Sequence, residues 1–310
     1  MVIDKHLIEE AAARVGSRVR VTPTIEIEPG TFENDAPIIL KLELLQHTGS
    51  FKPRGAFNRI LASVVPDSGV IAASGGNHGA AVAHAARVLS HRAEIYVPEL
   101  TPALKLERIA QYGANVVAIG ASYAEAFAAS QERAQQSGAL AVHAYDQEEV
   151  VAGQGTVGRE LERQAPDLDT VFVAVGGGGL IGGIAAWYAG RTRVIGVEPE
   201  LCPTLARALE AGRPVDEAVS GLAADSLGAR RIGDIAFAIA QRYVERVILV
   251  SDAEILAAQR LLWDRVRVLA EPGGAAALAG MLSGRYDARA GERVGVVVCG
   301  GNVTPGRFAS

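Results

Sequence analysis

A lysine placed just before a helix start is the first residue of this sequence whose type and position could do covalent chemistry. Lys52 lies in the segment Ser50–Gly55 (SFKPRG), and Pro53 suits the first turn of a helix. The positive end of a helix dipole lowers the pKa of a nearby amine, and a neutral amine can form a Schiff base with a carbonyl compound. A single lysine is far more often a solvated surface charge, so other motifs must decide whether Lys52 has a chemical role.

Four consecutive glycines, Gly176, Gly177, Gly178 and Gly179, form a second candidate site between a strand-like run and a helix-like segment. The backbone N–H groups of such a loop can converge on an anion, and the helix N-terminus adds positive charge, so we expect a phosphate ligand. A flexible turn is the structural alternative. A dinucleotide site is the functional alternative, because residues 177–182 fit G-x-G-x-x-G and Glu198 follows at the distance of a ribose-binding acid.

Two further polar turns complete the set of candidate sites. The segment Ser74–Gly79 (SGGNHG) offers N–H groups, a hydroxyl, an amide and an imidazole, which suit a carboxylate and a phenolic oxygen. The same turn could simply cap the helix that follows it. Cys299–Asn302 (CGGN) closes the last strand and places a thiol at its carboxyl end, although Cys299 could equally be a small buried apolar residue.

Strand-like and helix-like segments alternate along most of the chain and would position these turns. We expect strands at 38–42, 70–73, 93–97, 116–119, 140–144, 171–175, 194–197 and 294–298. We expect helices at 53–64, 77–89, 102–112, 123–136, 154–163, 180–189 and 251–268. The alternation predicts βαβ units and a parallel sheet covered on both faces. Ligands bind such sheets at the carboxyl ends of the strands, where the candidate turns lie.

Charge and hydropathy narrow the function classes. The 310 residues carry 30 Lys and Arg against 35 Asp and Glu, a net charge of −5, without a basic block, so we expect no nucleic-acid partner. There is no apolar run of about 18 residues and no signal-peptide pattern, so we expect no membrane association and a cytoplasmic location. Two cysteines, Cys202 and Cys299, cannot build a disulfide framework and favour a reducing compartment.

Together the motifs resemble those of the fold-type II pyridoxal-phosphate enzymes, specifically the threonine/serine dehydratase and serine racemase family. The resemblance rests on 42–58 (LELLQHTGSFKPRGAFN), 74–79, 176–180 (GGGGL), Glu271-Pro272 and 299–302, in the family's order, and it covers essentially the whole chain. The implied fold is α/β and similar to the tryptophan synthase β subunit, with two domains on twisted, mostly parallel sheets. The implied cofactor is pyridoxal 5′-phosphate.

The resemblance also implies a role for each motif residue. Lys52 would hold the cofactor as a Schiff base and later take the Cα proton of the substrate. Asn77 would bond the ring hydroxyl, the glycines would bind the phosphate, and Cys299 would face the pyridine nitrogen. The residues implied to contact the cofactor are Phe51, Lys52, Asn77, Gly176, Gly177, Gly178, Gly179, Leu180 and Cys299. Those implied to bind the substrate are Ser74, Gly75, Gly76, His78 and Tyr123.

The implied reaction is β-elimination from L-threonine or L-serine, which releases a 2-oxo acid and ammonia. A neutral thiol would not keep the pyridine nitrogen protonated, so we expect a long-lived carbanion to be disfavoured and loss of the β-hydroxyl to compete well. Serine racemisation is the alternative, which Gly75 weakens because the family's racemases carry a proton-donating serine there. 3-Hydroxyaspartate is less expected, because no arginine lies between Arg108 and Arg133 to hold a second carboxylate. A nicotinamide-dependent oxidoreductase would leave the lysine and asparagine motifs unexplained.

The family pattern also bears on a metal site, on the domains and on the oligomeric state. Glu198 matches one ligand of the family's divalent-cation site, but Thr204 replaces the second, so we expect a weak metal site or none. The chain ends soon after Asn302, so we expect no regulatory domain. We expect a large domain at 1–60 and 146–310, and an inserted small domain at 61–145 that closes over the substrate. The resemblance also implies a homodimer.

Overall fold

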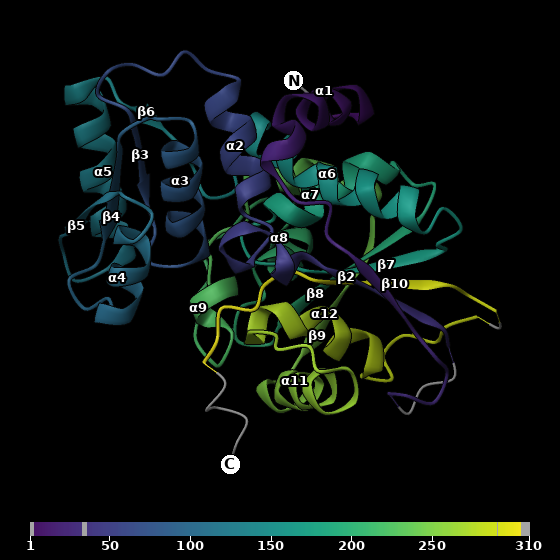
Figure 1. Cartoon of the computed structure of the whole chain (residues 1–310). Coiled ribbons are helices and arrows are strands. Elements are labelled where there is room, and N and C mark those ends of the chain that lie inside the picture. The colour runs from purple at the N-terminus through teal and green to yellow at the C-terminus, as the bar shows by residue number, and fades with distance from the viewer. Residues whose placement is uncertain (1–2, 33–35, 290, 305–310) are drawn as a thin grey trace.

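Two mainly parallel sheets form the framework of the protein, in a computed structural model that describes residues 3–32, 36–289 and 291–304. The large sheet has the strand order β1-β2-β10-β7-β8-β9, and the small sheet has the order β5-β4-β3-β6 (Figure 1). Strand β1 runs antiparallel to β2, whereas all the other neighbouring strands are parallel.

The strands are β1 (Thr24–Ile27), β2 (Ile38–Leu42), β3 (Val70–Ala73), β4 (Ala93–Val97), β5 (Asn115–Ala118), β6 (Leu140–Ala141), β7 (Thr170–Ala174), β8 (Arg193–Pro199), β9 (Val244–Val250) and β10 (Val294–Val298). The helices are α1 (Lys5–Val15), α2 (Pro53–Leu61), α3 (Asn77–Val88), α4 (Ala103–Ala110), α5 (Tyr123–Ser137), α6 (Glu148–Gln164), α7 (Gly179–Tyr188), α8 (Thr204–Ala211), α9 (Ala224–Leu227), α10 (Asp234–Tyr243), α11 (Asp252–Val266) and α12 (Pro272–Leu282). Short 3₁₀ turns lie at Gly16–Arg18, Glu43–Leu45 and His47–Gly49. Among the described residues, no helix is long and apolar enough to cross a membrane.

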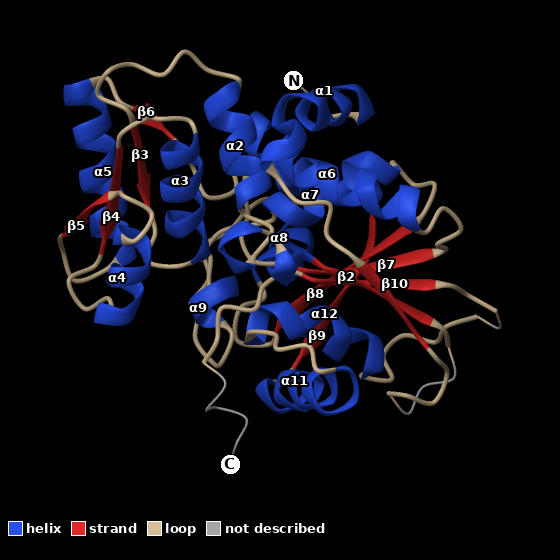
Figure 2. Ribbon diagram, in the orientation of Figure 1, coloured by secondary structure: helices blue, strands red, loops and turns tan. Residues whose placement is uncertain are grey.

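The large sheet carries the main hydrophobic core. Its central strands β7 and β10 are buried along their whole length and are rich in valine, as expected for parallel strands covered on both faces. Figure 2 shows helices α6 and α7 on one side of this sheet and α11 and α12 on the other. Strand β10 lies between β2 and β7 and runs parallel to both, so the turns that follow these three strands lie at one edge of the sheet.

The small sheet lies between α5 on one side and α3 and α4 on the other (Figure 2). Helix α3 buries mainly alanines, so its backbone can lie close to the strands. Helix α5 begins at the N-cap Ser122, whose side chain accepts from the Glu125 N–H, and ends at Gly138 with a left-handed φ of 69°. All four strands of this sheet fall within the range 61–145, and we propose that this range moves as one unit.

The structure corrects some of the expected elements. The strand expected at 140–144 ends at Ala141, because the backbone N–H of His143 bonds the Gln147 side chain at 2.8 Å instead of a neighbouring strand. The helix expected at 154–163 is longer and begins at Glu148. Strands β1 and β9 were not predicted. The capping box at Ser251 is confirmed, with Glu254 bonding back to the Ser251 N–H.

Candidate active site

Lys52 is held where strands β2 and β10 end. The Phe51 N–H donates to the Cys299 carbonyl at 3.1 Å, and Ser50 forms a bridge with Gly300. Lys52 itself is the N-cap residue of α2, and its Nζ donates to the carbonyl of Ala144 at 2.8 Å. Two turns that are far apart in the sequence therefore meet at this amine.

Burial is the main reason why the Lys52 amine is easily deprotonated. It lowers the pKa of Lys52 from 10.5 to about 8, against smaller opposing effects of Cys299 and Glu271. Desolvation, and not the helix dipole expected from the sequence, is the largest cause of the low pKa. The Nζ also lies 5.1 Å from the centre of the Phe51 ring. In the physiological pH range, part of the Lys52 amine is therefore neutral.

The glycine loop is packed so closely that side chains would not fit. A Cβ on Gly177 would lie 2.2 Å from a ring carbon of Tyr145, and one on Gly178, where φ is 91°, would lie 2.5 Å from Ala236. Helix α7 begins at Gly179, so the loop amides lie at the positive end of its dipole. This is the arrangement expected of a phosphate site.

Glu198 does not take part in this loop as a ribose-binding acid would. Its buried carboxylate accepts the N–H groups of Leu205 and Ala206 at 2.7 and 2.9 Å, and the Thr204 hydroxyl at 3.1 Å. It therefore caps the start of α8, which removes the acid that the dinucleotide interpretation requires. Within residues 3–32, 36–289 and 291–304, no group of three or more His, Cys, Asp or Glu side chains gathers as a metal site would.

One pocket brings together all the residues that the sequence analysis assigned to the cofactor. Its lining consists of Phe51, Lys52, Asn77, Tyr145, Ala174, Gly176, Gly177, Gly178, Gly179, Leu180, Ser226, Leu227, Glu271 and Cys299. No site role was predicted for Tyr145, Ala174, Ser226, Leu227 or Glu271, although Glu271 is part of the motif that carries the resemblance. Tyr145 could have been found, because it follows the strand that was predicted at 140–144 and so met the strand-end rule.

Cys299 is buried, and its thiol donates to the Gly273 carbonyl at 3.4 Å. Burial raises the pKa of Cys299 to about 12, so the thiol is neutral at physiological pH. Glu271, the N-cap residue of α12, accepts a hydrogen bond from the Asn77 side-chain nitrogen at 2.6 Å. Burial raises the pKa of Glu271 to about 7.

The residues expected to bind the substrate lie around the turn before α3, outside the lining of this pocket. Ser74 Oγ accepts the Gly76 N–H at 3.1 Å, and a Cβ on Gly75 would lie 2.9 Å from Thr101. His78 is buried, its Nε2 lies 2.9 Å from the Val142 carbonyl, and burial lowers its pKa to about 3. The imidazole is therefore neutral and engaged with the backbone, so the N–H groups of this turn are the better candidates for a carboxylate.

Tyr123, which was expected at the substrate side chain, starts α5 and is 46% exposed. It stacks on Phe127 at 6.0 Å, Phe127 contacts His143 at 5.6 Å, and His143 contacts Tyr145 at 4.7 Å between ring centres. An aromatic row thus joins Tyr123 at the surface to Tyr145 in the pocket.

The pocket fits pyridoxal phosphate on three independent features. The glycine loop provides a cradle that any Cβ would fill, the Lys52 amine suits an aldehyde, and the Cys299 thiol is a neutral partner for a pyridine nitrogen. When bound, the cofactor supplies an electron sink that makes the Cα–H bond of an amino acid acidic.

Comparison with known proteins agrees with this fit. Residues 15–300 match the family model described as "Pyridoxal-phosphate dependent enzyme". The chain is 38% identical to the L-threonine ammonia-lyase of Geobacter sulfurreducens over 96% of this chain and 75% of that protein. It is 39% identical to the biosynthetic L-threonine dehydratase of Pasteurella multocida over 87% of this chain, but spans only 54% of that protein. Maize serine racemase superposes with a TM-score of 0.93 at 32% identity, covering 100% of this chain and 96% of that one. On the family match and these likenesses, the chain belongs to the pyridoxal-phosphate dependent enzymes.

Proposed function

We propose that the protein is a pyridoxal-phosphate dependent ammonia-lyase that eliminates the β-hydroxyl of L-threonine, L-serine or both, and so forms a 2-oxo acid and ammonia. The observation that carries the proposal is the pairing of a readily deprotonated Lys52 amine with a neutral Cys299 thiol in one pocket. The threonine-specific names of the two bacterial relatives support this substrate class.

Lys52 would move the proton in the first chemical step. With a pKa of about 8, its amine is partly neutral at pH 7 and can accept the Cα proton of a bound amino acid. The carbonyl of Ala144, which accepts a hydrogen bond from Nζ, orients the amine. The turn before α3 would bind the substrate carboxylate through its N–H groups at the positive end of the helix.

Cys299 would favour elimination over reactions that need a long-lived carbanion. A group with a pKa of about 12 stays neutral and, unlike a carboxylate, cannot stabilise a positive charge on the pyridine nitrogen. Negative charge at Cα is then short-lived, and departure of the β-hydroxyl is the faster outcome. Gly75 disfavours the alternative, racemisation, because it has no side chain with which to return a proton on the opposite face.

We also propose a cytoplasmic homodimer. Both cysteines are buried as free thiols, which suits a reducing compartment. The dimer is supported by the family resemblance alone, and analytical ultracentrifugation of the purified protein tests it.

The experiment that tests the function is 2-oxo acid release from L-threonine, L-serine, their D-forms, phenylserine and 3-hydroxyaspartate. We expect release from L-threonine or L-serine, and none above background in Lys52→Ala. A chiral assay of recovered serine separates racemisation from elimination. No release from L-threonine or L-serine by protein that carries the cofactor would rule out the proposed substrates.

A further inference from the structure

The side-chain amide of Asn77 contacts two residues from the large-sheet part of the chain. Asn77 begins α3 beside the small sheet, whereas Glu271 precedes α12 and Asn302 follows β10. Asn77 Nδ2 donates to Glu271 Oε1 at 2.6 Å, and Asn77 Oδ1 accepts a hydrogen bond from Asn302 Nδ2. A primary amide has two N–H donors, so these contacts leave the second N–H for a group bound in the pocket that Asn77 lines.

Asn302 makes a hydrogen bond in which the donor and the acceptor are unambiguous. Its Nδ2 also donates to the backbone carbonyl of Thr48 at 2.9 Å, and a carbonyl can only accept. The side-chain nitrogen of Asn302 must therefore face the Thr48 carbonyl and Asn77, and Asn77 must accept with its side-chain oxygen. The Thr48 carbonyl thus orients the Asn302 amide, and the Asn302 nitrogen and the Glu271 carboxylate together orient the Asn77 amide, although an amide alone could be turned either way.

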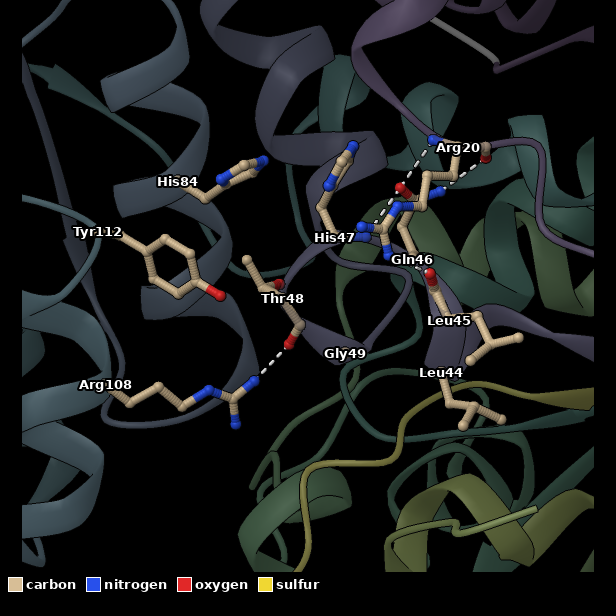
Figure 3. Close-up of a pocket in the computed structure, with 10 residues that line it drawn as sticks. All are labelled: Arg20, Leu44, Leu45, Gln46, His47, Thr48, Gly49, His84, Arg108 and Tyr112. Atoms are coloured by element: carbon tan, nitrogen blue, oxygen red, sulfur yellow. Dashed lines mark hydrogen bonds between the residues drawn. The ribbon is translucent and has the colours of Figure 1, made fainter. Parts of the chain in front are cut away.

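Thr48 itself has an unusual backbone conformation. Thr48 is β-branched, yet it has a φ of 62°, a conformation that such residues rarely adopt. Its carbonyl accepts a second hydrogen bond from Arg108, near the end of α4, at a pocket of about 400 Å³ (Figure 3). Gly49 comes next, and a Cβ there would lie 2.3 Å from Asn302 Oδ1. The backbone of this turn is thus shaped to admit Asn302.

We propose that Asn302 is a positioning residue, which fixes the Asn77 amide with its nitrogen toward the pocket so that the second N–H meets the ring oxygen of pyridoxal phosphate. In the reversed orientation, the Asn77 oxygen would face the Glu271 carboxylate and the ring oxygen, which are both electron-rich. The inference goes beyond the proposed reaction, because it concerns how the cofactor ring is held whichever amino acid is the substrate.

The variant Asn302→Asp tests the proposal, because aspartate keeps the shape but has no N–H to donate. Residue 302 and Glu271 would then compete as acceptors for the Asn77 nitrogen, so the amide would no longer be held with its second N–H toward the pocket. We expect the dissociation constant for pyridoxal phosphate to rise about tenfold or more, as for the loss of a hydrogen bond to a charged group. We also expect the bound cofactor to lose intensity in its long-wavelength absorption band relative to its short-wavelength band, since the ring oxygen has lost its donor.

Two controls make the result specific. Asn115→Asp is the same change at an exposed position of β5 and should leave both readouts as in the wild type. Asn77→Asp removes the donor itself and should reproduce the spectral change, and the double variant should show little more than either single variant, because both act on one interaction.

A wild-type spectrum and affinity in Asn302→Asp would overturn the proposal. A weaker affinity with an unchanged ratio of the two bands would also overturn it, since that is the result of a purely structural role. If the variant does not fold, neutron diffraction of the wild-type holoenzyme decides, because deuterons on the Asn77 nitrogen must point at the ring oxygen. None of these readouts needs turnover, so a failure of the proposed reaction is distinguishable from a failure of this inference.

Discussion

Among single residues, the environment of the Lys52 amine has the clearest chemical consequence. A pKa of about 8 in place of 10.5 means that, at pH 7, the neutral fraction is greater by about two orders of magnitude than for an ordinary lysine. The neutral form is the nucleophile toward an aldehyde. Lys52 is therefore more reactive than an exposed lysine, because its charged form is buried and nearby groups stabilise that charge only in part.

We predict that the rate at which the cofactor-free protein captures pyridoxal phosphate rises with pH through about 8, where it is half-maximal, and levels off about one to two pH units higher. The pKa of this base is lowered, so half of the amine is neutral at about pH 8 and nearly all of it is neutral above that range. Stopped-flow absorbance across pH 6–10 measures the rate. Cys299→Asp should move the plateau to higher pH, because a carboxylate beside Lys52 favours the charged amine, whereas the neutral Cys299→Ser should not. A rate that keeps rising through pH 10 would contradict the prediction.

Among the elements, the start of α8 shows how a buried carboxylate can be used for capping instead of chemistry. Pro203 precedes this helix, and Glu198, five residues earlier, accepts the N–H groups of Leu205 and Ala206. The Thr204 hydroxyl lies 3.2 Å from the carbonyl of Gly176, so the capped end of α8 also borders the glycine loop. The cap therefore links β8, α8 and the phosphate site.

We predict that Glu198→Gln changes the pH dependence of stability in a defined direction. Burial raises the pKa of Glu198 to about 7 from 4.5, so between these values the folded protein binds a proton that the unfolded chain releases. The stability that Glu198 contributes is thus present below pH 4.5 and is lost as the pH rises through 7. Relative to the variant, the wild type should lose about 3 kcal/mol of unfolding free energy over this range.

Urea unfolding of the cofactor-free proteins at pH 4.5, 6 and 8 measures this difference. The other titrating groups, including the buried His78, occur in both proteins and therefore cancel. Glu200→Gln, at an exposed position two residues away, is the matched control for the same chemical change outside the core. A constant difference for Glu198→Gln would show that this carboxyl does not titrate in the range.

At the scale of the whole molecule, one ion pair joins a helix beside the small sheet to a helix of the large-sheet part. Lys105 of α4 pairs with Asp225 of α9, and α9 in turn packs on the glycine loop, since a Cβ on Gly176 would lie 3.1 Å from Leu227. The Asp225 side chain is 70% exposed, so the pair adds little stability. The ion pair is useful as a marker, because it lies where the small-sheet part of the chain contacts the large-sheet part.

We predict that a covalent link between residues 105 and 225 slows turnover. In the double variant Lys105→Cys with Asp225→Cys, a short bis-maleimide cross-link should lower the rate about tenfold or more, because substrate entry and product release require the parts to separate. The protein before cross-linking should keep most of its activity, and each single variant treated with the reagent is the control. Equal rates before and after cross-linking would show that the small-sheet part need not move.

The sequence by itself determined the local features of this protein. The alternation of apolar strands with helices, the four glycines before α7 and the lysine before α2 all express short-range rules of periodicity, turn geometry and helix start. Most of the strands could therefore be predicted from residue types and their spacing, and so could the glycine loop and the lysine turn as candidate sites. The other residues assigned to the cofactor came from the resemblance to a known family, although parallel strands do place their carboxyl ends at one edge.

Only the tertiary structure decided which distant side chains meet. Asn77 contacts Glu271 across 194 residues and Asn302 across 225, and no periodicity links such positions. The use of Glu198 as a helix cap and of the Val142 carbonyl as the partner of His78 likewise depends on how the helices pack against the strands. Hydrogen-bond partners of buried polar groups are chosen by packing, because each group must find a partner wherever the folded chain places it.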